Sequence, residues 1–123
     1  MLTEQWIKEH THSADDFLYY AVSEYFTERG LPMPNSENAL HFLVSEVGEL
    51  SDAVVQDKGE WIRNNPEKTR DISDEVGDVL MMLVVFCLQR GISPAKCMIN
   101  KMRRKLALTT VGTHSIMKNK KGD

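Results

Sequence analysis

Two stretches of the chain place a pair of carboxylates three residues apart around the same Val-Gly filler. The first is EVGE at 46–49, and the second is EVGD at 75–78. Residues three apart share one face of a helix, so each pair would present its negative side chains together. Glu and Asp oxygens in such pairs are ligands for hard divalent cations. The candidate ligands are Glu46, Glu49, Glu75 and Asp78.

The two pairs can face each other across a groove if their helices pack antiparallel. Converging carboxylates would repel by up to about 4 kcal/mol per close pair at an effective dielectric constant of 20. A divalent cation offsets that repulsion, and Mg²⁺ is usually held by a few carboxylates together with waters and substrate phosphates. We therefore expect Mg²⁺, with Mn²⁺ as the alternative. A single pair of this kind usually belongs to a solvated helix face, and the repetition of the pair is what favours a metal site.

Each pair also encloses a glycine, Gly48 or Gly77. A glycine inside a helix costs about 1 kcal/mol relative to alanine. Its presence in both pairs predicts a close approach of another backbone or of a ligand.

The helix expected to carry the second pair spans 71–90, DISDEVGDVLMMLVVFCLQR, and Gly91 closes it. Its residues 79–88 are apolar without a break, which is shorter than the roughly 20 residues needed to cross a bilayer. A helix that is apolar on every side must be covered on every side. This run is therefore either the centre of a core or part of a subunit interface, and Cys87 within it is expected to act as a small core hydrophobe.

The helix expected to carry the first pair begins at a cap, Asn35 or Ser36, and continues to about Asp57. Its apolar residues form one stripe within an arc of about 120°. Glu46 and Glu49 fall just off one edge of this stripe, near the core boundary. The stripe consists of Leu40, Leu43, Val44, Val47, Leu50 and Val54.

The remaining segments predict two more helices. Residues 1–10 are expected to form a short amphipathic helix that ends at residues 11–13. Ser13 and Asp16 then resemble a capping pair at the start of a helix over 15–29. A Ser93-Pro94 cap predicts the last helix, from Pro94 to about Leu108. The segments 31–34 and 58–68 are expected to be loops. The predicted fold is all-α with four main helices over a domain of 1–108, a helical bundle completed by homo-oligomerisation, followed by a flexible polar tail at 109–123.

The composition limits the classes of function. The chain has 123 residues, with 15 Lys and Arg against 18 Asp and Glu and a formal charge of −3. It lacks the basic excess of nucleic-acid-binding proteins, so we expect no nucleic-acid partner and no membrane partner. Two cysteines give neither a disulfide framework nor metal-binding spacing. The beginning of the chain is too polar for a signal peptide, so a cytoplasmic location is expected.

The last predicted helix carries a basic segment at 101–105, KMRRK. Lys101, Arg104 and Lys105 lie on adjacent turns of one side, next to Asn100, and this arrangement suits a phosphate chain. The alternative is a solvated helix whose cations complement the helix dipole.

Three of these segments together resemble the MazG-like branch of the all-α nucleoside triphosphate pyrophosphohydrolases. They are SEVGELSDAV, DEVGDVLMML and NKMRRK, and the similarity covers roughly 39–108. The resemblance implies Mg²⁺-dependent hydrolysis of a nucleoside triphosphate between the α and β phosphates, which yields the monophosphate and pyrophosphate. It implies that the four carboxylates hold the metal ions, that the basic segment contacts phosphates, and that the chain assembles into a homodimer or homotetramer.

One carboxylate is expected to take a proton from the attacking water, and Glu46 and Glu49 are the candidates. The base specificity is open, because Gln56 stands about where some deoxycytidine-preferring relatives place a tryptophan. Five side chains are candidates for contacting the base, although each also suits a core or surface position: Phe17, Tyr20, His41, Phe42 and Trp61.

Three other functions are alternatives for an all-α chain. A di-iron carboxylate bundle would need Glu-x-x-His motifs, and no histidine stands three residues after a glutamate in either acidic motif. A non-enzymatic helical interaction module would use the apolar helix for assembly alone. Hydrolysis of phosphoribosyl-ATP by a related fold is the third.

Overall fold

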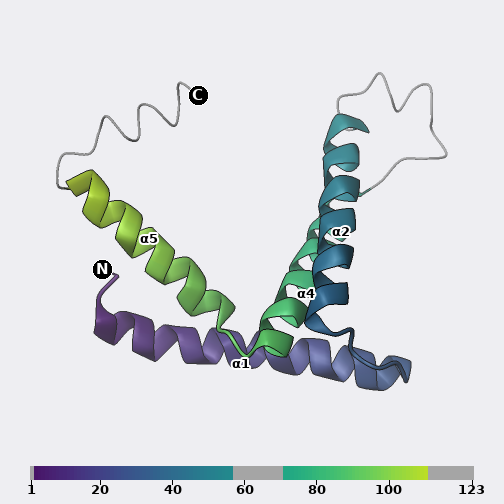
Figure 1. Cartoon of the computed structure of the whole chain (residues 1–123), viewed down its shortest axis with the longest axis horizontal. Helices are drawn as coiled ribbons and strands as arrows, with labels where there is room; N and C mark the ends of the chain where they lie inside the picture. The colour runs from purple at the N-terminus through teal and green to yellow at the C-terminus, as the bar shows by residue number, and fades with distance from the viewer. Residues whose placement is uncertain (1, 57–70, 111–123) are drawn as a thin grey trace. The chain divides into compact units, whose positions relative to one another are not determined.

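The computed structural model describes residues 2–56 and 71–110. These residues form four α-helices and contain no strand: α1 (Glu4–Arg29), α2 (Ser36–Gln56), α4 (Ile72–Arg90) and α5 (Pro94–Thr110) (Figure 1). The predicted all-α fold with four main helices is confirmed for this part of the chain. The predicted loop at 58–68, with Trp61, lies outside the described residues. Residues 111–123 of the predicted tail at 109–123 also lie outside them, whereas its first two residues continue α5. No single described helix is long and apolar enough to cross a membrane, although α4 and α5 taken together pass that test by length and composition.

Local capping explains where three of the helices begin. The Asn35 side chain accepts a hydrogen bond from the backbone N–H of Asn38 at 2.8 Å, and Asp71 accepts one from Ser73 at 2.8 Å. Ser93 caps α5 in the same way. Each side-chain oxygen satisfies a backbone donor that has no partner inside its helix. The predicted starts of these helices are therefore confirmed.

The end of α4 is also as predicted. Gly91 adopts a left-handed conformation with φ of 67°, which a residue without a Cβ atom reaches at little cost. Its backbone N–H donates back to the carbonyl oxygens of the last turn of α4, which closes the helix.

The predicted break in the first helix is wrong. Instead of a short piece followed by a cap at Ser13, α1 runs without interruption from Glu4 to Arg29. Thr11 is buried, and its hydroxyl donates to the backbone carbonyl of Ile7 at 2.7 Å. The threonine thus satisfies its polar group within the helix and does not interrupt it.

The described residues divide into two compact units. One combines the start of α1, up to Asp16, with α5, and the other runs from Phe17 to Ile92. The larger unit contains the rest of α1 together with α2 and α4, and its core gathers Val22, Ala39, Val84 and Val85.

The helices α2 and α4 lie side by side and antiparallel (Figure 1). Ala39, near the start of α2, belongs to the same core cluster as Val84 and Val85 near the end of α4. The beginning of one helix therefore meets the end of the other. This orientation is the one under which the two acidic pairs can face each other.

The predicted use of the apolar stripe on α2 needs correction. Four of its members are exposed in the single chain: Leu40, Val44, Val47 and Val54. Val44 is the most open of them, at 65% exposed. The residues of α2 that are buried are Ala39, Ala53 and Gln56, which lie on the edge of the helix that also carries the carboxylates. Small side chains on that edge let α2 pack closely on α4, and the larger apolar residues are left outward.

The apolar run of α4 is only partly covered within the described chain. Met82, Val84, Val85 and Cys87 are buried, as expected for the centre of a core. Leu80 and Leu83, in contrast, are exposed. The run thus combines the two roles that the sequence left open, because part of it is core and part is exposed and available to a partner.

Candidate metal centre

The four predicted carboxylates meet in the larger unit. One oxygen from each of Glu46, Glu49, Glu75 and Asp78 lies within 4.8 Å of the others. The first two come from α2 and the last two from α4, so the antiparallel packing of these helices creates the cluster. It unites groups that are about thirty residues apart in the sequence.

The cluster is partly withdrawn from solvent. Glu75 is buried at 8% exposure, and the other three carboxylates are half-buried. Reduced access to water strengthens the repulsion among the negative charges. A proton or a cation bound at this position would relieve that repulsion.

The pKa of the Glu46 carboxyl group is raised within this cluster. Burial of the Glu46 carboxyl group raises its pKa from 4.5 to about 7. A hydrogen bond with Glu49 contributes to the rise, and so does the negative charge of Glu49, Asp78 and Glu75. A group that is held partly neutral by its neighbours in this way is a common feature of functional sites.

The donor set fits a hard divalent cation. Oε2 of Glu46 is buried and has no hydrogen-bond partner among the described residues. A buried oxygen of this kind ordinarily has a partner. Clustered carboxylate oxygens are the ligands that Mg²⁺ and Mn²⁺ take in proteins. The residues present could therefore bind a divalent metal.

The two glycines are not explained by packing within the chain. A Cβ atom added at Gly48 or Gly77 would meet no atom within 4 Å among the described residues. The predicted close approach of another backbone is thus not made by the described part of this chain. A ligand or a second copy remains the predicted neighbour.

The predicted phosphate-binding residues lie on α5, in the smaller unit. Asn100, Lys101, Arg104 and Lys105 are all exposed on this helix. Their presence on one exposed side agrees with the helical spacing in the sequence. Their contact with a phosphate chain stays a prediction.

The described candidates for contacting the base all lie at exposed positions. Phe17, Tyr20, His41 and Phe42 are exposed, and Trp61 lies outside the described residues. Exposure makes the first four available to a ligand, but it equally suits an assembly surface. Their role therefore stays a prediction.

Sequence reasoning missed an open apolar pocket of about 240 Å³ between α1 and α4. The side chains around it repeat at helical spacing on both helices, and that repetition was the available signal. Gly77, inside the second acidic pair, contributes to its wall. The pocket is lined by Leu18, Ala21, Val22, Tyr25, Gly77, Leu80, Met81 and Val84.

Comparison with known proteins agrees with the geometry. The model of the MazG nucleotide pyrophosphohydrolase domain matches residues 35–107. No curated protein and no solved structure gives a significant match. The matched region covers more than half of the chain and includes both acidic pairs and the basic segment. The chain therefore belongs to the MazG nucleotide pyrophosphohydrolase family.

Proposed function

We propose that this protein is a Mg²⁺-dependent nucleoside triphosphate pyrophosphohydrolase. It cleaves ribo- or deoxyribonucleoside triphosphates between the α and β phosphates and releases the monophosphate and pyrophosphate. Its role is the removal of unwanted nucleotides from the cellular pool. The convergence of four carboxylates from α2 and α4, in a chain of the MazG family, is the observation that carries this proposal.

The carboxylates of Glu46, Glu49, Glu75 and Asp78 hold the cation in this proposal. A bound divalent cation would neutralise phosphate charge and lower the pKa of a coordinated water. Glu46 or Glu49 accepts the proton of the attacking water. Both groups are half-buried in the free chain.

Substrate recognition is assigned to two further groups of residues. Asn100, Lys101, Arg104 and Lys105 on α5 bind the phosphate chain through charge-assisted hydrogen bonds. The base stacks on aromatic or imidazole rings, and the candidates remain Phe17, Tyr20, His41, Phe42 and Trp61. The preferred base and sugar are left to experiment.

The enzyme is proposed to act as a homodimer or homotetramer in the cytoplasm. The exposed apolar stripe of α2 and the exposed Leu80 and Leu83 of α4 support assembly. Apolar residues at regular helical spacing on an exposed face need a partner. A second copy of the chain is the partner that a closed, symmetric assembly uses.

The test is a panel of nucleoside triphosphates, incubated with Mg²⁺ or with a chelator, with the products identified. We expect monophosphate and pyrophosphate in equal amounts, and only with Mg²⁺. The Glu49→Gln variant should lose activity by about 100-fold or more, because it removes a carboxylate from the cluster. Glu37→Gln, on the exposed first turn of α2, should keep full activity and serves as the matched control.

Two results would contradict the proposal. Hydrolysis that continues unchanged in the Glu49→Gln variant would place the chemistry elsewhere. No hydrolysis of any nucleotide by the folded wild-type chain would leave a non-enzymatic assembly module, which the exposed apolar stripe also suits. Phosphoribosyl-ATP belongs in the panel, because preferential cleavage of that compound would identify the related activity.

A further inference from the structure

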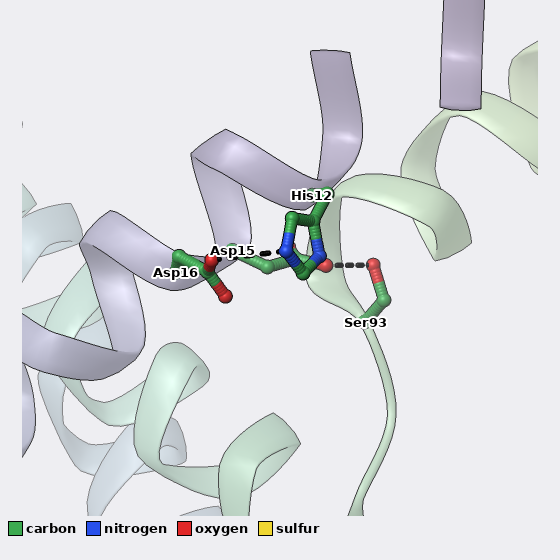
Figure 2. A network of polar contacts seen from close by, with 4 residues as sticks. All are labelled: His12, Asp15, Asp16 and Ser93. Atoms are coloured by element: carbon green, nitrogen blue, oxygen red, sulfur yellow. Dashed lines mark hydrogen bonds and ion pairs between the residues drawn. The ribbon is translucent and has the colours of Figure 1, made fainter. Parts of the chain in front are cut away.

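In the smaller unit, a single buried carboxylate joins α1 to α5. Asp15 lies on α1 and is 7% exposed. It accepts hydrogen bonds from the hydroxyl of Ser93 and, at 3.2 Å, from the backbone N–H of Ala95 (Figure 2). Ser93 in turn accepts a hydrogen bond from the backbone N–H of Lys96 at 3.0 Å. Asp15 and Ser93 together therefore satisfy the first turn of α5.

This contact differs from an ordinary helix cap. The first turn of a helix has backbone donors without partners, and it favours a negative charge. Here the charge comes from another helix, some eighty residues earlier in the sequence. The bonds that cap α5 consequently also hold α5 against α1.

Few large apolar side chains of this unit are buried. Thr11 and Ile7, one and two turns before Asp15 on α1, are buried, and Ile99 is buried on α5. The other large apolar side chains described on α5 are exposed: Met98, Met102, Leu106 and Leu108. The carboxylate of Asp15 thus supplies specific polar contacts that hold the start of α5 on α1, beside this limited apolar burial.

We propose that Asp15 is a positioning residue for the phosphate-binding side chains of α5, acting through Ser93. Lys101 and Arg104 lie two to three turns beyond the capped end, on a helix whose direction is set at that end. The role rests on the proposed function, because it presumes that these cations hold the phosphate chain. A shift of α5 would weaken substrate binding and leave the carboxylates of α2 and α4 in place.

The neighbouring acidic residue provides a matched control. Asp16 is exposed and forms an ion pair with His12 at 3.2 Å, on the same helix (Figure 2). It makes no described contact with α5. Asp16→Ala removes the same charge as Asp15→Ala without affecting the cap of α5.

The first measurement is hydrogen exchange of the α5 backbone amides in full-length protein, which needs no activity. Loss of a charged hydrogen bond should raise exchange near Ala95 and Lys96 by about tenfold or more in Asp15→Ala. Exchange in Asp16→Ala should match the wild type. Exchange that is unchanged in Asp15→Ala would overturn the proposal, since α5 would then be held by other contacts.

The second measurement is steady-state kinetics with the nucleotide that the wild type hydrolyses best. Asp15→Ala should raise KM by about fivefold or more with kcat changed by less than about twofold, as expected for the loss of uniform substrate binding. Mn²⁺ binding should not change. Ser93→Ala should raise KM in the same way, and Ser93→Thr, which retains the hydroxyl, should restore it.

The outcomes separate this role from the proposed function. An active wild type whose Asp15→Ala variant keeps the wild-type KM overturns the positioning role alone. An inactive wild type overturns the proposed function, and the positioning role with it. If Asp15→Ala fails to fold, Asp15→Asn retains one acceptor oxygen, and it should give faster exchange and a higher KM than the wild type. A wild-type KM in this variant would count against the proposal.

Discussion

The carboxyl group of Glu46 connects burial, charge and metal binding at one residue. Its raised pKa arises from burial first, and then from its hydrogen bond with Glu49 and from the neighbouring negative charges. The folded chain holds a proton on Glu46 more tightly than an unfolded chain would. Protonation of this residue therefore stabilises the metal-free fold.

This linkage predicts how the stability of metal-free protein depends on pH. The contribution of Glu46 should be complete below about pH 4.5 and should be lost as the pH rises through about 7. Glu46→Gln keeps the shape of the side chain and has no charge to repel. In the presence of a chelator, the melting temperatures of the two proteins should be similar at pH 4.5. The variant should be the more stable one at pH 8.

Added Mg²⁺ or Mn²⁺ provides the control for that experiment. The cation should raise the melting temperature of the wild type at pH 8, because it binds the folded state only. The same cation should raise the melting temperature of the Glu46→Gln variant by a smaller amount. A wild type as stable as the variant at pH 8 without metal would show that the four charges do not strain the fold.

At the scale of single residues, the sequence predicts which carboxylates form the cluster. It does not predict every acidic residue that holds the structure together, as Asp15 shows. Glu46, Glu49, Glu75 and Asp78 can be singled out because a three-residue spacing fixes a shared helix face. Asp15 could not be singled out in that way. Its partners lie some eighty residues away, and its importance follows only from tertiary contact.

At the scale of the helices, the local capping signals identify most of the boundaries. Asn35, Asp71, Ser93 and Gly91 act within three or four residues of themselves, so they can be recognised without tertiary information. The break expected near Thr11 had the same kind of local basis and is wrong. A buried threonine bonded to the preceding turn has the same sequence signal as one that ends a helix.

The cap of α4 gives a prediction at this scale. Asp71→Ala removes the side chain that accepts from the Ser73 N–H, and should lower the free energy of unfolding by about 1 kcal/mol. The measurement is denaturant unfolding at neutral pH with Mg²⁺ present. Asp74→Ala, in the first turn of the same helix, should cost less because it affects only the interaction with the helix dipole. Equal losses in both variants would exclude a specific cap at Asp71.

At the scale of the whole molecule, the apolar surface of the single chain remains to be explained. The stripe on α2 was expected to lie in the core, since its spacing is that of a buried helix face. The sequence pattern shows which face of α2 is apolar. It does not show whether the same chain or a second one covers that face. Within the larger unit, Ala39 and Ala53 bring the carboxylate edge of α2 toward α4, and Leu40, Val44 and Val47 face outward.

Assembly is the prediction that belongs to this scale. Val44→Lys introduces a charge into the exposed stripe and should shift the protein toward monomer in sedimentation velocity, because an interface would have to bury that charge. Ser45→Lys adds the same charge one position along, on a different face of α2, and should leave the assembly intact. A wild type that is monomeric at micromolar concentration would contradict the proposed oligomer.

The most direct test of the account is the binding of Mn²⁺ to metal-free protein, followed by electron paramagnetic resonance of the free ion. If the carboxylates of α2 and α4 hold one cation cluster, Glu49→Gln and Asp78→Asn should each weaken binding by about tenfold or more. Asp52→Asn, at an exposed position of α2, should bind as the wild type does. Equal affinity in the wild type and in all three variants would contradict the account.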